Sequence, residues 1–177
     1  MRTELIALRS AMKKAGIDLY VIPTDDFHGS EYVGDYFKCR KYVSGFDGSA
    51  GTLVVTADWA GLWTDGRYFL QAARQLTGTG IDLCKMGEPG VPTVLQYVRD
   101  HLSPGKTLGF DGRSMTLSAG RELETAAKAA GGETNAGLDL VGEIWTDRPA
   151  LPAEGVWALP LQYTGRTRGD KLKALRA

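Results

Sequence analysis

The sequence predicts an α/β fold in which a mixed β-sheet is flanked by helices on both faces. Segments with helical periodicity alternate with short β-rich runs along most of the chain, an order typical of a sheet covered by helices. Two neighbouring β-rich runs have a very short connection, which indicates one antiparallel hairpin within the alternating order. Of the 177 residues, 43% are hydrophobic and 24% charged, which is the composition of a globular chain with a buried core.

The N-terminal segment predicts a helix followed by a strand. Leu5, Leu8 and Met12 fall on one helical face, and Gly16 stands where a left-handed C-terminal cap would end the helix. Residues 17–22 are rich in side chains that favour β-structure and are followed by proline, which predicts the first strand.

The middle of the chain predicts a short helix, a hairpin and a longer helix. Residues 30–32 are expected to open the short helix. Thr52–Thr56 and Ala60–Thr64 predict the two strands of the hairpin. Asp65 is a suitable N-cap for a helix that continues to about residue 76.

Helices and strands continue to alternate in the second half. Residues 81–86 predict a strand, and residues 92–101 a helix with a proline in its first turn. Thr107–Phe110 predicts another strand, residues 117–130 an alanine-rich helix that two glycines end, and residues 138–145 a last short helix.

A change in composition at Arg148 divides the chain. Residues 1–148 are expected to form the main domain, residues 149–158 a proline-rich linker, and residues 159–177 a separate segment. The helix that starts near Asp170 is barely two turns long and would be unstable alone. The chain therefore looks as if it stops inside an element, as a piece of a longer protein would.

Charge and cysteine content exclude several classes of function. There are 21 basic and 21 acidic residues, so the chain lacks the basic excess of a nucleic-acid-binding protein. No apolar run is long enough to cross a membrane, and the N-terminus does not have the apolar stretch of a signal peptide. Two isolated cysteines fit a reducing compartment. We expect a cytoplasmic protein that binds neither nucleic acid nor membrane.

The densest polar cluster directly follows the first predicted strand, where functional groups of α/β proteins gather. It contains Asp25, Asp26, His28 and Glu31. One hypothesis is a divalent-metal or acid–base site, as in a small metal-dependent hydrolase. The favoured interpretation is a loop whose side chains cap backbone groups, because the rest of the chain supplies no obvious additional ligands.

A second candidate lies between the hairpin and the following helix. Arg67 has the planar, forked guanidinium that binds a carboxylate through two hydrogen bonds. Its partner could be a bound ligand or an acidic residue of its own domain, and the sequence leaves both alternatives open.

Several segments, in their order along the chain, resemble the N-terminal domain of Xaa-Pro aminopeptidases (aminopeptidase P) of the long, three-domain kind. Each segment alone is a modest match, but the ordered set is specific and covers nearly the whole chain. The segments are residues 18–26, 30–32, 44–52, 62–72, 110–113 and 143–149.

The resemblance implies a creatinase/prolidase N-terminal fold with a sheet of ribonuclease H-like type, and it makes residues 159–177 the truncated start of a second, similar domain. It also implies that the parent enzyme removes an N-terminal residue that precedes proline. In the family, two divalent metals, usually manganese, are bound by two Asp, one His and two Glu of a C-terminal domain. None of these ligands matches a residue of this chain, so the chain alone is expected to hold no metal and no catalytic residue.

By the same resemblance, the domain is expected to pack with the C-terminal catalytic domain of its own polypeptide, to help form a homodimer, and to limit access of peptide substrates with proline at the second position. The candidates for the edge that faces substrate or the partner subunit are Trp63, Arg67 and the loop with Asp25, Asp26, His28 and Glu31. The alternative function is a free-standing protein-binding module without enzymatic activity.

Overall fold

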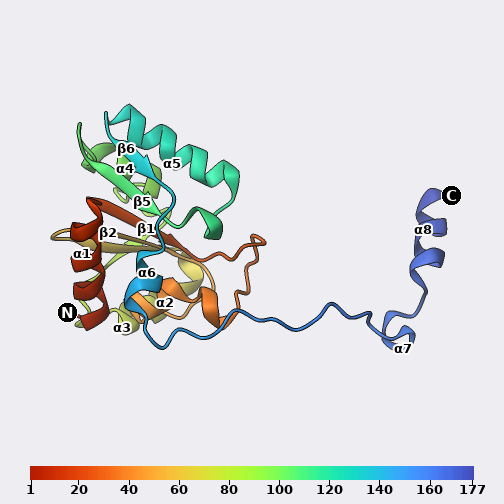
Figure 1. The fold of residues 1–177 in the computed structure, drawn as a ribbon. Coiled ribbons are helices and arrows are strands. Elements are labelled where there is room, and N and C mark those ends of the chain that lie inside the picture. The colour runs from red at the N-terminus through yellow and green to blue at the C-terminus, as the bar shows by residue number, and fades with distance from the viewer.

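The computed structural model describes residues 1–177 and contains a six-stranded sheet with the strand order β4-β3-β2-β1-β5-β6 (Figure 1). β2 runs antiparallel to β1 and β3, whereas the other pairs of neighbours are parallel. The expected mixed sheet is therefore confirmed. The strands are β1 (Leu19–Pro23), β2 (Thr52–Thr56), β3 (Ala60–Thr64), β4 (Asp82–Lys85), β5 (Thr107–Phe110) and β6 (Glu133–Asn135).

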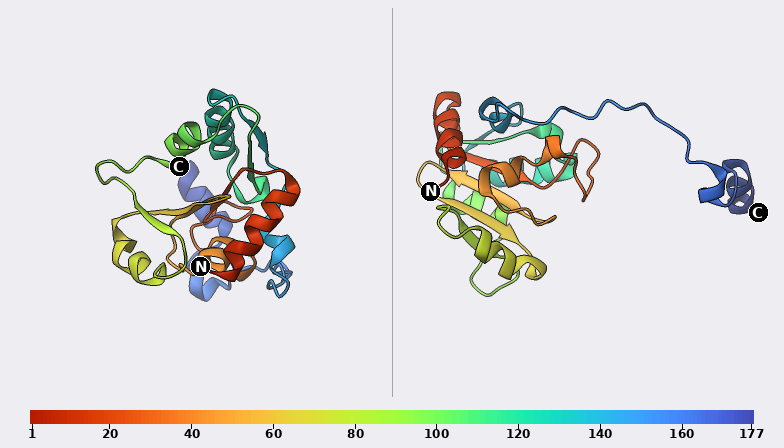
Figure 2. Two further views of the ribbon diagram at one scale, coloured as in Figure 1. Left: turned by 90° about the vertical axis from the view of Figure 1, so that its left-hand side faces the viewer. Right: turned by 90° about the horizontal axis from the view of Figure 1, so that it is seen from below.

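Helices cover both faces of the sheet, so the central strands are buried on both sides (Figures 1 and 2). One layer consists of α1 (Thr3–Ala15), α2 (Cys39–Ser44), α3 (Phe69–Gln75) and α6 (Leu140–Ile144). The other consists of α4 (Val94–His101) and α5 (Leu117–Ala129). Three short 3₁₀ helices, η1 (Asp35–Phe37), η2 (Gly66–Tyr68) and η3 (Gly112–Ser114), follow loops or strand ends.

The central strand β1 shows how the sequence specifies two cores. Tyr20 and Ile22 belong to the cluster beneath α1, and Leu19 and Val21 to the cluster beneath α4 and α5. This alternation follows from the two-residue period of a strand. Because both faces meet apolar helices, the strand has no polar side.

Two local predictions differ from the structure, and two elements were not predicted. No helix begins at residues 30–32: Ser30 donates its backbone N–H to the Asp26 carboxylate, and residues 31–32 form a bend. Pro92 precedes the N-cap of α4, which Thr93 forms together with Gln96 in a capping box. Helix α2 and strand β6 were not predicted.

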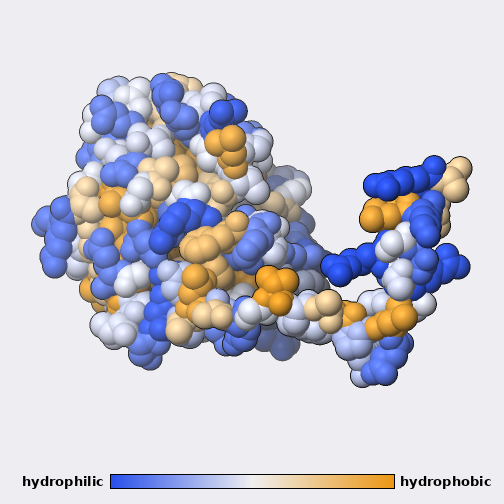
Figure 3. All heavy atoms as spheres, turned by 45° about the vertical axis from the view of Figure 1, so that its right-hand side comes forward, coloured by the Kyte–Doolittle hydropathy of each residue, from blue (hydrophilic) through white to orange (hydrophobic).

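The chain beyond the domain is extended and exposed. Residues 149–160 have no regular secondary structure, and α7 (Leu161–Thr164) and α8 (Arg168–Arg176) bury no residue. Figure 2 shows this extension leading away from the body of the domain, and Figure 3 shows hydrophobic residues along it. Trp157 is 71% exposed. None of the helices is long and apolar enough to span a membrane.

Candidate functional site

The candidate residues meet at one edge of the sheet. Because β1, β3 and β5 run in the same direction, their carboxyl ends lie side by side, the position at which α/β proteins bind ligands. The loop after β1 carries the acidic cluster, and each of the other two strands is followed by the tripeptide Asp-Gly-Arg. The sequence-predicted loop and Arg67 therefore share this edge.

The loop after β1 is held by its own aspartates. The Asp26 side chain accepts hydrogen bonds from the backbone N–H groups of His28 (2.8 Å) and Ser30 (3.0 Å). Asp25 accepts from the N–H of Asp26 at 2.8 Å. His28 points into solvent and its ring lies 3.8 Å from Asp26, while Glu31 is exposed. The geometry is that of a loop capped by aspartates, as the favoured interpretation expected.

This capping should make the loop sensitive to acid. The backbone N–H of Ser30, together with that of His28, holds the pKa of Asp26 below its ordinary value. A carboxyl with a lowered folded-state pKa stabilises above its unfolded pKa of about 3.9 and loses that contribution as the pH falls through the folded pKa. We expect protection of the His28 and Ser30 amides to decrease as the pH falls below about 4. Amide exchange followed by NMR measures this.

The matched variant for this prediction is Asp26→Asn, which keeps an acceptor oxygen but has no charge to titrate. Its loop should be less protected at neutral pH and should lack the acid transition. An equal acid transition in both proteins would show that another group controls the loop.

Arg67 is exposed and held in one orientation. Its Nε donates to Oδ1 of Asp65 at 2.9 Å and its Nη2 to Oδ2 at 2.8 Å, so one carboxylate binds the guanidinium through two bonds. Asp65 also accepts from the backbone N–H of Arg67 and thereby caps η2. The hydrogen bond from Arg67 lowers the pKa of Asp65 to about 2. The side chain of Arg67 remains 62% exposed, and its Nη1 makes no hydrogen bond within the chain.

The second Asp-Gly-Arg tripeptide repeats this geometry after β5 with a different outcome. Arg113 Nε and Nη2 donate to Asp111 at 3.0 and 2.9 Å. Its Nη2 also donates to Asp139 at 3.0 Å, so this arginine is shared between two carboxylates of its own domain. Both arginines keep Nη1 free of hydrogen bonds within the chain, but Arg113 is held by two carboxylates and Arg67 by one, so Arg67 is the less constrained of the two.

A cavity of about 270 Å³ lies at this edge, between the loop after β1 and the glycine-rich turn before β2. Glu31 and Ser49 are among its lining residues, and Ser49 Oγ contacts Glu31 at 3.4 Å and the Tyr68 hydroxyl at 2.8 Å. Lys38 and Lys41 add positive charge to its wall. The cavity thus offers charged groups and hydroxyl groups, and Ser49 links its wall to Tyr68, the residue that follows Arg67.

Sequence reasoning missed Arg40, a buried residue that lines this cavity. Its guanidinium donates to Thr24 Oγ1 at 2.7 Å, to the Phe46 carbonyl at 3.1 Å and to the Gly48 carbonyl. No carboxylate pairs with it. In sequence it stands among Lys38 and Lys41 and resembles a solvated basic run, so no signal distinguished it.

The expectation that Trp63 lies on an edge facing substrate or the partner subunit is wrong. Its side chain is 1% exposed and belongs to the core beneath α4 and α5. The indole Nε1 donates to the Pro92 carbonyl at 2.7 Å. Strand β3 is buried along its whole length, because helices cover both faces, so a position next to the exposed tripeptide still points inward.

Nothing in the chain assembles a metal centre. No group of three or more His, Cys, Asp or Glu side chains is placed to hold a metal ion. Asp25, Asp26, His28 and Glu31 share one loop, but the two aspartates are engaged with backbone N–H groups and His28 and Glu31 face solvent. These residues do not fit the two-metal site that the resemblance implies for a peptidase, and no reaction step is assigned to them.

The architecture is that of a small α/β domain that presents polar loops at the carboxyl edge of a mixed sheet. The chain belongs to the Creatinase/Prolidase N-terminal domain family, which it matches over residues 5–140. It corresponds to the N-terminal domain of Xaa-Pro aminopeptidases, as its similarity to individual proteins shows.

The chain is 44% identical to Aminopeptidase P2 of Arabidopsis thaliana, a match that covers 91% of this chain and 23% of that protein. It is 41% identical to a probable Xaa-Pro aminopeptidase P of Pyricularia oryzae, with 97% and 28% covered. The crystal structure of an X-prolyl aminopeptidase from Caenorhabditis elegans, a cytosolic enzyme with a di-nuclear active site, superposes with a TM-score of 0.84 at 39% identity, covering 98% of this chain and 30% of that one. The chain therefore spans about a quarter of the length of these relatives.

Proposed function

We propose that this domain is the non-catalytic N-terminal part of a metal-dependent Xaa-Pro aminopeptidase, where it contributes to dimer assembly and to substrate access. The similarity to Xaa-Pro aminopeptidases over nearly the whole chain supports the activity of the longer protein. A C-terminal catalytic domain of the same polypeptide would then supply a two-metal centre, with manganese as the proposed metal. The cytosolic C. elegans enzyme supports a cytoplasmic location.

The observation that carries the proposed role in substrate access is the presentation of Arg67. Asp65 binds the guanidinium on one side and leaves Nη1 directed away from the pair. A guanidinium fixed in this way loses little conformational entropy when it binds a second acceptor. Peptides offer backbone carbonyls and a terminal carboxylate, both of which accept hydrogen bonds from arginine. The loop with Asp25, Asp26, His28 and Glu31 completes the proposed edge toward substrate or the partner subunit.

Replacing Arg67 in the full-length enzyme tests this role. Arg67→Ala should lower kcat/KM for Xaa-Pro peptides roughly tenfold, mainly through KM, or should weaken the dimer, because a hydrogen bond to a charged group is lost. Steady-state kinetics and mass in solution measure the two effects. The domain should remain as stable as the wild type, because the Asp65 pair is exposed and such pairs add little stability.

The matched control is Arg99→Ala. Arg99 is also exposed and paired with a neighbouring aspartate, Asp100, but it lies near the end of α4, toward the amino ends of the strands. Its replacement should change neither kinetics nor mass. Unchanged kinetics and unchanged mass in Arg67→Ala would contradict the proposed role of Arg67 in substrate access and dimer assembly.

A further inference from the structure

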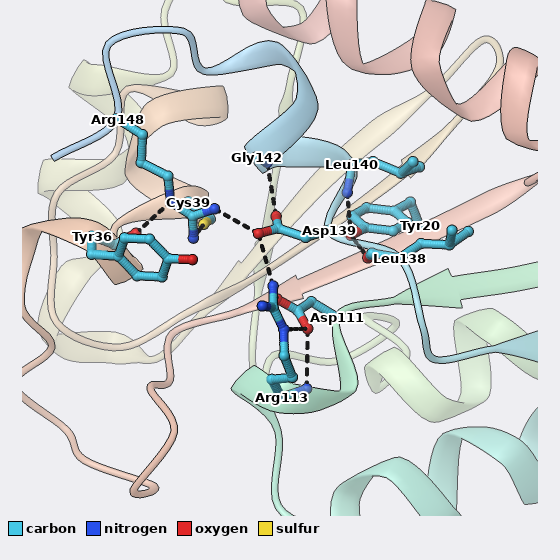
Figure 4. Close-up of polar contacts among 10 residues, drawn as sticks. All are labelled: Tyr20, Tyr36, Cys39, Asp111, Arg113, Leu138, Asp139, Leu140, Gly142 and Arg148. Carbon is cyan, nitrogen blue, oxygen red and sulfur yellow. Dashed lines mark hydrogen bonds and ion pairs between the residues drawn. The ribbon is translucent and has the colours of Figure 1, made fainter. Parts of the chain in front are cut away.

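One carboxylate, that of Asp139, joins two arginines from distant parts of the chain (Figure 4). Its Oδ1 accepts from the backbone N–H of Gly142 at 2.8 Å and so caps α6. Its Oδ2 accepts from Arg113 Nη2 at 3.0 Å and from Arg148 Nη1 at 2.6 Å. Neither arginine is needed to cap the helix, so their common attachment requires another explanation.

Arg148 connects this carboxylate to the end of the loop that follows β1. Its Nε donates to the Tyr36 carbonyl at 2.8 Å, and its guanidinium lies 3.8 Å from the centre of the Tyr36 ring. Its Nη2 lies 3.1 Å from Cys39 Sγ. The side chain is only 10% exposed, although Arg148 is the residue from which the chain leaves the domain.

Arg113 connects the same carboxylate to the beginning of the loop. Its guanidinium lies 5.5 Å from the centre of the Phe27 ring. Phe27 and Tyr36 also contact each other edge to face, with ring centres 6.3 Å apart. The two ends of the segment 27–36 are thus each covered by an arginine, and both arginines are bound to Asp139, whereas the segment between them has only short turns and bends and the beginning of η1.

We infer that Asp139 is a positioning residue: through Arg113 and Arg148 it fixes the loop 27–36 relative to the point at which the chain leaves the domain. The loop and the start of the linker at Arg148 then keep one relative position. The consequence for substrate access rests on the proposed function, but the coupling itself does not.

The two cysteines of the chain offer a local test. Burial raises the pKa of both thiols to about 11, so both react slowly with iodoacetamide. Cys39 is in contact with Arg148, whereas Cys84 lies in β4, at the opposite edge of the sheet from β6. In Asp139→Asn, which keeps an acceptor for the Gly142 N–H but has no charge, alkylation of Cys39 should become roughly tenfold faster while that of Cys84 stays unchanged. Peptide mass spectrometry distinguishes the two sites.

Amide exchange provides a second readout. Exchange in residues 28–36 should increase in Asp139→Asn while the β1–β2 ladder stays protected. Asp139→Asn alone should also lower the thermal stability, because it leaves Arg148 without its charge partner. The double variant Asp139→Asn/Arg148→Met removes both charges of the pair and should recover much of this loss. The double variant should nevertheless keep the fast amide exchange in residues 28–36 and the fast alkylation of Cys39. If Asp139 only stabilised the domain, recovering the stability would also reverse both effects. Glu124→Gln, which breaks the exposed pair with Lys128, is the control and should change neither readout.

Equal acceleration at both cysteines, or no change at Cys39 and in residues 28–36, would overturn the inference. Because these measurements do not use enzymatic activity, they are independent of the Arg67 experiment. Failure of Arg67→Ala would contradict the role in substrate access and leave the coupling intact.

Discussion

Replacing Trp63 by alanine is expected to lower the free energy of unfolding by about 3–5 kcal/mol, because a large buried aromatic side chain is removed and a cavity remains. The indole is 1% exposed and packs against Trp59 and Tyr97, with ring centres 5.8 and 5.3 Å apart. The Pro92 carbonyl also loses its hydrogen-bond donor just before α4 begins. Urea unfolding followed by circular dichroism measures the change.

Trp157→Ala is the matched control for this prediction. This tryptophan lies on the extended segment and is 71% exposed, so its removal should leave the unfolding free energy of the domain within about 0.5 kcal/mol of the wild type. A loss of less than about 1 kcal/mol in Trp63→Ala would mean that the core beneath α4 and α5 collapses around the missing ring.

The second large effect is expected at Arg40. Arg40→Met removes a buried donor and leaves the carbonyls of Phe46 and Gly48 without partners, which should lower the free energy of unfolding by about 2–4 kcal/mol. Burial lowers the pKa of Arg40 to about 10, while nearby Asp47 acts in the opposite direction. Arg40→Met also removes a buried charge that has no carboxylate partner, which is favourable. The expected loss of unfolding free energy is therefore smaller than the summed contributions of the three lost hydrogen bonds.

Lys41→Met tests whether the effect depends on burial. This neighbour is exposed and should change stability by less than about 0.5 kcal/mol. If Arg40→Met were as stable as the wild type, the turn before β2 would not depend on the buried guanidinium. Amide exchange in residues 46–51 would show directly whether the turn has loosened.

The elements predicted from sequence are those whose signal is local. β5 was predicted with its observed bounds, and the hairpin of β2 and β3 follows from two short β-rich runs with a minimal connection. Gly16 adopts the expected left-handed conformation, with φ at 68°. Such signals depend on neighbouring residues alone, so no tertiary information is needed.

The missed elements depend on distant contacts. β6 is a three-residue strand of polar residues, and it forms because β5 offers an unpaired edge to Glu133–Asn135. α2 has no side chain that caps its N-terminus, and its six residues are held by burial of Val43 and Arg40. Short elements of this kind are stabilised by packing, which local propensity does not encode.

The residues of the candidate site also divide into those with a local sequence signal and those placed by distant contacts. The capped loop with Asp26 and the exposed Arg67 were within reach of sequence reasoning, because Asp, Ser and Gly after a strand have known local roles. Trp63 was misplaced because its burial depends on α4, which packs on the sheet from a distant part of the sequence. Asp139 gave no local signal as an anchor, since Arg113 and Arg148 reach it only in the folded domain.

The position of β1 in the sheet has a consequence for how the protein is made. β1 is synthesised first, and one of its two neighbours, β2, follows within the next 33 residues, since it ends at Thr56. The other neighbour, β5, ends only at Phe110. Until that part of the chain has left the ribosome, one hydrogen-bonding edge of a strongly apolar strand is open, and such edges bind other nascent chains. Association with other chains is therefore expected to be strongest while the domain is half synthesised.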